Sequence, residues 1–296
     1  MGKFALDVCS VVSLAALSFS AVAGQTEDSA RESCRVATSL TRLAGIREAS
    51  GIAVSRRTPG VLWSVNDSGA PILYALNTSG AIIGRVRVMG AQVDDWEDVS
   101  VASCPAGSCV YIADIGDNNA NRNRIAVYRV TEPEPGAPST EIAERFSASY
   151  PEGPQDAEAL LVAPQGRLFI VTKGSTGPIS LYRFPADIQA GTSVVLERVS
   201  ALPIAGAASH DAPRVTDAEA SPDGQWVAIR THHAVLFYRT SDLISGSPRE
   251  SFRADVRVLR EPQGEGVAIA SNGDVYLVGE SKSVGTFARL ACTFPR

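Results

Sequence analysis

The chain has 296 residues, with 27 Lys and Arg against 32 Asp and Glu, so its formal net charge is −5 at pH 7. This acidic balance argues against a nucleic-acid partner, because such a partner requires a basic surface. Short apolar runs separated by repeated turn residues, with few long helical periodicities, favour an all-β fold.

The first residues have the pattern of a secretory signal peptide. Lys3 supplies a positive charge, residues 8–21 form an apolar run, and Ala21-Val22-Ala23 is a cleavage sequence of the A-x-A kind. We predict a signal peptide over residues 1–23, a flexible segment over 24–33 and a single domain over 34–296. No later stretch has the roughly 18 apolar residues that a spanning helix needs. We therefore expect a secreted or periplasmic monomer without a membrane span.

Five copies of one pattern organise the rest of the chain. In each copy, a polar leader residue stands before an alternating apolar run that predicts a β-strand. The leader residues are spaced by 47, 61, 58 and 49 residues: Ser50, Glu97, Glu158, Thr216 and Glu265. Repeats of about 40–60 residues, with about four strands each, are typical of a β-propeller. Six blades would need another leader residue between 97 and 158 or between 158 and 216, and none is found. We predict five blades.

The strands predicted for the blades follow the leader residues in chain order. They cover residues 50–54, 61–65, 72–76 and 82–88 in the first blade; 99–102, 110–113, 125–130 and 146–149 in the second; 160–162, 168–171, 180–184 and 194–199 in the third; 226–230, 235–238 and 256–259 in the fourth; and 267–270, 275–278 and 287–290 in the fifth. A proline-rich insert, residues 132–138, interrupts the second blade. The fifth blade lacks an outer strand. Residues 35–43 are predicted to supply it and so to cover the exposed sheet edges.

The cysteines support this closure. Of five cysteines, Cys9 leaves with the signal peptide, and four remain in an oxidising compartment. Cys104 and Cys109 flank a short turn between two strands, which indicates a disulfide that joins a hairpin. Cys34 and Cys292 then pair by elimination and join the two ends of the domain. Metal binding by these cysteines is the alternative, but no C-x-x-C pair is present.

The leader residues should meet at one mouth of the central channel, because each first strand lines it. The loops after the second strands return to the same mouth. These loops carry polar and charged residues: Asp67, Asp114, Asp117, Asn118, Lys173, Arg230 and Glu280. The carboxylates of Glu97, Glu158 and Glu265 would repel one another unless a cation or a proton lies among them. Oxygen ligands in a roomy channel suit Ca²⁺. The alternative is that they cap strand starts or bind water.

The order Ser50, Glu97, Glu158, Thr216, Glu265 resembles the channel calcium site of five-bladed calcium-activated nucleotidases (apyrases), which carry Ser-Glu-Glu-Ser-Glu. Residues 65–74 resemble the first-blade loop of that family, with Ser68 where the family has an arginine. The segments 96–98 and 114–119 resemble secreted bacterial propellers grouped with phytase-like and esterase-like proteins. These resemblances imply a channel Ca²⁺ and a hydrolytic activity.

Two functional hypotheses follow. In the first, the protein is a metal-dependent hydrolase of phosphate or carboxylate esters, and Asp67, Asp114 or Asp117 activates water. Lys173 and Arg230 would bind a small anionic substrate, with Asn118 and Glu280 beside it. In the second, it is a non-catalytic binding propeller with Ca²⁺ as a structural plug. Arg230 would then pair with a carboxylate such as Asp217 or Glu219. A zinc site is not expected, because His210, His232 and His233 match no zinc motif.

Overall fold

The structure, a computed structural model, describes residues 1–2, 33–175, 177–204 and 213–294. The predicted signal peptide and flexible segment lie almost wholly outside these residues, as does His210, so all three stay untested. Residues 31–296 form one compact unit. No helix in the described part of the chain is long and apolar enough to cross a membrane.

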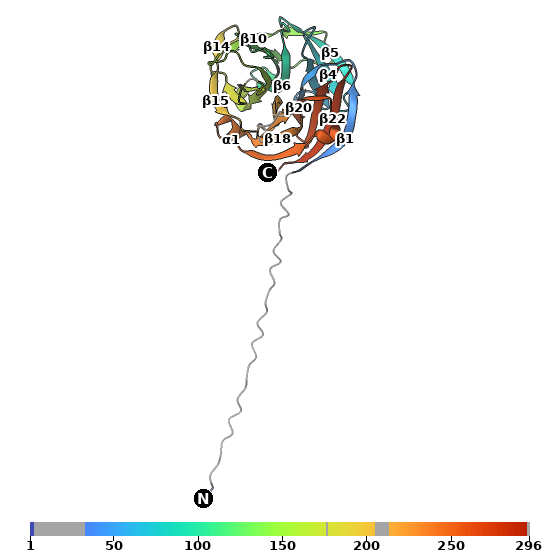
Figure 1. Cartoon of the computed structure of the whole chain (residues 1–296). Helices are drawn as coiled ribbons and strands as arrows, with labels where there is room; N and C mark the ends of the chain where they lie inside the picture. The colour runs from blue at the N-terminus through green and yellow to red at the C-terminus, as the bar shows by residue number, and fades with distance from the viewer. Residues whose placement is uncertain (3–32, 176, 205–212, 295–296) are drawn as a thin grey trace. The chain divides into compact units, whose positions relative to one another are not determined.

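Five sheets of this unit form the blades of a propeller, and the four main strands of each are antiparallel (Figure 1). The strands of the first three blades are, from the inside outward, β2 (Ala49–Val54), β3 (Val61–Asn66), β4 (Ile72–Asn77) and β5 (Ile82–Met89); β6 (Trp96–Cys104), β7 (Gly107–Asp114), β8 (Ile125–Thr131) and β10 (Glu144–Ser149); and β11 (Ala157–Ala163), β12 (Arg167–Thr172), β13 (Ser180–Arg183) and β15 (Glu197–Ala201). Those of the last two are β16 (Val215–Ala220), β17 (Trp226–Thr231), β18 (Ala234–Arg239) and β19 (Glu250–Asp255); and β20 (Gln263–Ile269), β21 (Asp274–Glu280), β22 (Gly285–Thr293) and β1 (Ser33–Leu43).

The first strands of the blades form a closed inner ring. β2 packs against β6, β6 against β11, β11 against β16, β16 against β20, and β20 against β2. Because the ring returns to its starting strand after five members, the prediction of an all-β, five-bladed propeller is confirmed. The leader residues of the repeat therefore mark the inner strand of every blade.

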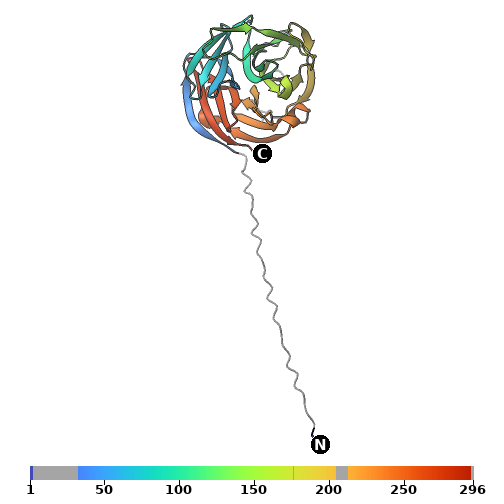
Figure 2. The ribbon, with the colours of Figure 1, turned by 180° about the vertical axis from the view of Figure 1, so that it is seen from behind.

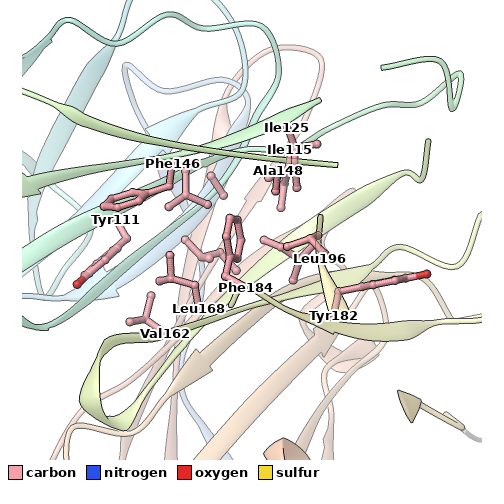
Figure 3. Close-up of a cluster of buried hydrophobic side chains, with 14 of the residues drawn as sticks. Tyr111, Ile115, Ile125, Phe146, Ala148, Val162, Leu168, Tyr182, Phe184 and Leu196 are labelled. Carbon is pink, nitrogen blue, oxygen red and sulfur yellow. The ribbon is translucent and has the colours of Figure 1, made fainter. Parts of the chain in front are cut away.

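Apolar side chains between neighbouring blades form the core. Figure 3 shows the cluster between the second and third blades, where Ile125 and Phe146 meet Leu168 and Phe184. Middle strands contribute most, because both of their faces are covered by adjacent blades. Thus all residues of β17 are buried. Alternating apolar runs in the sequence become the interfaces between blades in this way.

The N-terminal strand closes the last blade, as predicted. β1 pairs antiparallel with β22, and Cys34 stands opposite Cys292 in the register. Figure 2 shows the blue β1 along the outer edge of the red strands of the fifth blade. Both predicted disulfides are present, Cys34–Cys292 and Cys104–Cys109. The second joins the hairpin of β6 and β7.

Loss of the first disulfide should be the more damaging of the two. It closes a loop with a sequence separation of 258, against 5 for the other. The chain-entropy relation gives about 4–5 kcal/mol for a loop of the longer kind and less for a short one. We expect Cys34→Ser to lower Tm more than Cys104→Ser, as measured by differential scanning calorimetry. A larger loss for Cys104→Ser would contradict this.

Two outer strands differ from the prediction. The fourth blade ends in β19, and residues 256–259 form a turn with the 3-10 helix η2 (Arg257–Leu259) instead of the predicted strand. The Asp255 carboxylate accepts the backbone N–H of Arg257 at 3.0 Å and ends the strand. Val256 and Leu259, three residues apart, are then buried together while Val258 is 70% exposed. Burial at a spacing of three residues suits a turn and not a strand.

The expected strand at 194–199 is divided between two blades. β14 (Ser193–Val195) pairs parallel with β10 of the second blade, and β15 pairs antiparallel with β13 of the third. Leu196 lies between them, buried in the core cluster. The proline-rich insert similarly leads into β9 (Ser139–Ile142), which pairs parallel with β5 of the first blade. Both segments join neighbouring blades at their outer edges.

Candidate functional site at the channel mouth

All five leader residues lie at irregular positions of the inner strands. The register between the first and second strands shifts at each one, between Ala49 and Ile52, Trp96 and Asp98, Ala157 and Ala159, Val215 and Asp217, and Gly264 and Val267. A residue at such a bulge is unpaired, and its side chain is redirected from the regular pleat. The same irregularity at Ser50, Glu97, Glu158, Thr216 and Glu265 makes them equivalent positions. Each of them is at most 9% exposed.

Lys173 neutralises part of this acidic ring. It follows β12, and its ammonium group is paired with the Glu158 carboxylate. It also lies 3.9 Å from Oδ2 of Asp156 and donates to Oδ1 of Asn118 at 3.4 Å. The sequence-predicted residues Glu158, Lys173 and Asn118 are therefore brought together at the mouth. Asp156, which the sequence did not single out, is the fourth member of this group.

Glu97 and Asp95 form a second carboxylate group. Gly116 leaves the space for it: a Cβ atom on this residue would lie 2.2 Å from Oε1 of Glu97 and 2.4 Å from Oδ2 of Asp95. Burial, and next the charge of Asp95, raise the pKa of Glu97 well above its usual range, while Lys173 acts in the opposite direction. Burial likewise raises the pKa of Asp95. The positive charge near these two carboxylates is therefore too small to offset the effect of burial on their pKa values.

Glu265 and Asp67 belong to the same acidic mouth. Burial is the main cause that raises the pKa of Glu265 to about 8, and the charge of Glu280 adds to it. Burial and a hydrogen bond shared with Glu48 raise the pKa of Asp67 to about 7. The Oδ1 atom of Asp67 is buried and has no hydrogen-bond partner among the described residues. Glu280 lines a neighbouring pocket of about 370 Å³ together with Arg47, Glu48 and Lys282.

Asp114 and Asp117 have structural partners. Asp114 is paired with Arg122 at 2.8 Å and accepts the backbone N–H of Asp95 at 3.1 Å. Asp117 accepts the backbone N–H groups of Asn121 and Arg122 at 2.9 and 2.8 Å. Both carboxylates thus hold the loop between β7 and β8.

Arg230 is completely buried, at 0% exposed. Its guanidinium group pairs with Glu261 and donates to the backbone carbonyls of Gly266 and Val278. The partner is neither Asp217 nor Glu219, the two carboxylates that the sequence suggested. These contacts lie between the fourth and fifth blades and give Arg230 a structural role there.

Asp98 on β6 and Asp217 on β16, each directly after a leader residue, are buried close to each other. Asp98 accepts the backbone N–H of Leu160 at 2.7 Å, and Asp217 accepts that of Val267 at 2.5 Å. Each aspartate thus contacts the inner strand of the next blade. Burial and the proximity of Asp217 raise the pKa of Asp98 well above its usual range. Burial raises that of Asp217 to about 7. Two buried carboxyl groups this close to each other are most stable when they share one proton, because two negative charges would repel.

This pair predicts a pH dependence of stability. Folding raises both pKa values above the ordinary 3.8 of an aspartate, so the contribution is complete below that value and is lost as pH rises through about 7. Asp217→Asn supplies a permanent donor to Asp98 and keeps an acceptor for Val267. We expect the variant to lose less stability than the wild type between about pH 5 and about pH 9 in urea unfolding. The exposed control Asp187→Asn should follow the wild type. Equal slopes for wild type and Asp217→Asn would contradict a shared proton.

A larger pocket, of about 960 Å³, opens at the opposite end of the channel. Arg56 and Arg57 line it, and Arg56 donates to the hydroxyl of Ser103 and the carbonyl of Pro222. Its two arginines are both engaged with neighbouring blades, since Arg57 pairs with Glu134 at 2.7 Å.

Comparison with known proteins adds little beyond the architecture. No family model and no curated protein matches the chain. Among solved structures, the PQQ-bound aldose sugar dehydrogenase from Streptomyces coelicolor is similar at 14% identity and a TM-score of 0.49, covering 89% of this chain and 99% of that chain. A gluconolactonase from Xanthomonas campestris is similar at 12% identity and a TM-score of 0.46, and the match covers 83% of this chain and 72% of that chain. The calcium-binding protein regucalcin from Agrobacterium tumefaciens is similar at 10% identity and a TM-score of 0.45, and the match covers 88% of this chain and 96% of that chain.

These similarities are too weak to carry an argument about function. The three proteins named include neither an apyrase nor a phytase, so those resemblances are not shown. The class of protein established here is a five-bladed β-propeller with two disulfides and an acidic channel mouth.

Proposed function

We propose that the chain is an exported Ca²⁺-binding propeller that hydrolyses small phosphate or carboxylate esters at the channel mouth. The single observation that carries the proposal is the bulge at every leader residue, which gives five polar side chains equivalent positions around one channel. A purely structural inner strand needs no such irregularity five times. The two disulfides are compatible with an oxidising compartment.

The residues of the mouth fit a hard cation in their chemistry. Ser50, Glu97, Glu158, Thr216 and Glu265 offer only oxygen ligands, as Ca²⁺ prefers. Glu97 is 9% exposed, and its pKa is shifted by burial and by neighbouring charges. Within residues 33–175, 177–204 and 213–294, no three His, Cys, Asp or Glu side chains are grouped as metal ligands. The Glu158 carboxylate is instead paired with the ammonium group of Lys173.

In the proposed site, the five leader residues would hold Ca²⁺, which would polarise the ester and stabilise negative charge on it. Lys173, once released from Glu158, would contact an anionic group of the substrate, with Asn118 and Glu280 beside it. Asp67 is the one member of the predicted catalytic set without a structural partner for its Oδ1 atom. Arg230, Asp114 and Asp117 would keep the mouth in shape.

A non-catalytic binding propeller is the second candidate. The specific observation in its favour is that Arg230, Asp114 and Asp117, which the hydrolase hypothesis had assigned to chemistry, all have structural contacts. In this case Ca²⁺ would only hold the blades together.

Calcium should raise Tm in either case, because a ligand that binds only the folded chain stabilises it by mass action. We expect Glu97→Gln to reduce the Ca²⁺-dependent shift in Tm by more than half, since it removes one charged ligand and keeps the side-chain shape. Glu141→Gln, at an exposed position, is the control. Differential scanning fluorimetry with Ca²⁺ or EDTA measures both. If neither EDTA nor Ca²⁺ changes the melting curve of the wild type, the proposal of a cation site is wrong.

The two candidates are separated by turnover. The wild type should hydrolyse members of a panel of 4-nitrophenyl phosphate and 4-nitrophenyl carboxylate esters, and EDTA should abolish the reaction. A protein that shows the Ca²⁺ shift in Tm but no turnover on the panel would support the binding propeller.

A further inference from the structure

His232 lies at the mouth although no motif pointed to it. It stands between β17 and β18, and the pairing of Val215 with Thr231 places this loop beside Thr216. The hydroxyl oxygen of Thr231 accepts the backbone N–H of Ala234 at 3.1 Å, which fixes the loop. The imidazole is therefore held on a short, ordered connection next to a leader residue.

One hydrogen bond settles the tautomer of this histidine. Its Nδ1 atom lies 3.2 Å from the carbonyl oxygen of Gly264. A carbonyl oxygen can only accept, so Nδ1 must carry the proton and Nε2 keeps its lone pair. Among the described residues, Nε2 has no hydrogen-bond partner. The ring is thus oriented as a proton acceptor.

The acceptor carbonyl is itself fixed in place. Gly264 directly precedes Glu265, and a Cβ on it would lie 2.4 Å from Nη2 of Arg230. The buried Arg230–Glu261 pair therefore packs against the segment that orients His232. This links the imidazole, the bulge at Glu265 and the start of β20 in one unit.

The surroundings keep His232 neutral. Burial is the main cause that lowers its pKa below the ordinary 6.5, and the positive charges of Arg230, Lys173 and His233 act in the same direction. The Gly264 carbonyl acts against them. At neutral pH the imidazole is therefore in the unprotonated form that a general base requires.

Asp67 is less suited to this task. It shares a hydrogen bond with Glu48, whose pKa is lowered by its contacts with Ser68 and Asn66. Between two such carboxyls, Glu48 is the more acidic, so the proton stays on Asp67 until the pH rises through about 7. A protonated carboxyl cannot take another proton from water.

The mouth also disfavours a doubly charged substrate. Lys173 is the one cation paired with a leader residue among the described residues, and the carboxylates of Asp95, Glu97, Glu265 and Glu280 surround it. Arg230, the expected phosphate ligand, is buried against Glu261. The two cations expected to bind an anionic substrate, Lys173 and Arg230, are thus both paired with carboxylates, and an uncharged carboxylic ester needs neither of them.

We propose that His232 is the general base for hydrolysis of an uncharged carboxylic ester at this mouth; the inference rests on the proposed function. Nε2 takes a proton from water as the water oxygen bonds to the ester carbonyl carbon, and the π electrons move to the carbonyl oxygen. The adduct then collapses, the bond to the alcohol oxygen breaks, and Nε2–H returns its proton to that oxygen. One ester and one water give one acid and one alcohol.

The test compares His232→Gln with His233→Gln on 4-nitrophenyl acetate and butyrate in saturating Ca²⁺. Glutamine keeps a polar amide of similar size with an N–H donor but is not a base. We expect kcat to fall at least about 100-fold for His232→Gln, with the acid limb of the pH–rate profile lost. Ca²⁺ affinity by calorimetry should change less than about twofold. The exposed His233→Gln should keep the wild-type kcat and retain the acid limb of the pH–rate profile.

Each other outcome is informative. Wild-type turnover that survives His232→Gln, with its pH profile intact, overturns the general base and leaves the hydrolase standing. Turnover of 4-nitrophenyl phosphate in preference to the carboxylic esters overturns the substrate class. No turnover at all overturns both hydrolase and base, while the Ca²⁺ shift in Tm still reports on the cation site. Nitrogen-15 NMR of the imidazole that shows the proton on Nε2 would also overturn the proposal.

Discussion

Arg230→Met should lower the free energy of unfolding by about 3–5 kcal/mol, because it leaves the Glu261 carboxylate buried without its cation. The side chains of Arg230 and Glu261 are 0% and 2% exposed, so water cannot replace the lost partner. The carbonyls of Gly266 and Val278 would also lose their donor. Urea unfolding followed by tryptophan fluorescence measures the effect, and Ca²⁺ affinity should be affected far less than stability.

The double variant Arg230→Met/Glu261→Leu separates loss of the pair from loss of packing. With both charges gone, no ion is left buried, and the stability should recover most of the loss seen for Arg230→Met. Arg253→Met is the matched surface control. Its partner Glu250 is partly exposed, and the expected cost is about 0.2–1 kcal/mol. If Arg230→Met were as mild as Arg253→Met while turnover collapsed, Arg230 would be a substrate-binding residue after all.

The architecture could be predicted because its signals are local or repeated. Each leader residue directly precedes an apolar run, so the sequence marks the inner strand of every blade. Cys34 and Cys292 needed only elimination to be paired, and their pairing placed β1 beside β22. By contrast, the outer strand of the fourth blade was placed a few residues late, since apolar Val256 and Leu259 were assumed to belong to a strand. Their burial comes from a turn.

The chemistry of the site was less predictable because it depends on contacts between blades. Nothing near Arg230 in the sequence shows that Glu261, on the approach to the next blade, is its partner. The tautomer of His232 is likewise set by a carbonyl 32 positions away. The bulges at the leader residues leave no trace in the apolar alternation. One available signal was a glycine, because Gly116 stands where the carboxylates of Asp95 and Glu97 need space.

Lys173→Met should raise the Ca²⁺ affinity of the channel mouth about 10–100-fold, which corresponds to about 1.4–2.7 kcal/mol. In the wild type, the Lys173 ammonium group is paired with Glu158 and lies near Asp156. Ca²⁺ has to displace it to use Glu158, and a displaced ammonium still repels the ion at short range. Methionine keeps most of the side-chain volume and removes both costs.

The same substitution should destabilise the protein when Ca²⁺ is absent. Glu158 is only 5% exposed, and without Lys173 its charge has no partner on that side. Tm in EDTA should therefore fall, and the shift on adding Ca²⁺ should exceed that of the wild type, because tighter binding stabilises the folded chain more.

Lys282→Met is the control, since this exposed lysine lines the pocket beside Glu280 and pairs with no leader residue. Its Ca²⁺ affinity, measured by calorimetry in chelator-treated buffer, should stay within about twofold of the wild type. Unchanged or weaker Ca²⁺ binding by Lys173→Met would mean that Glu158 is a partner for lysine and not a ligand for the ion.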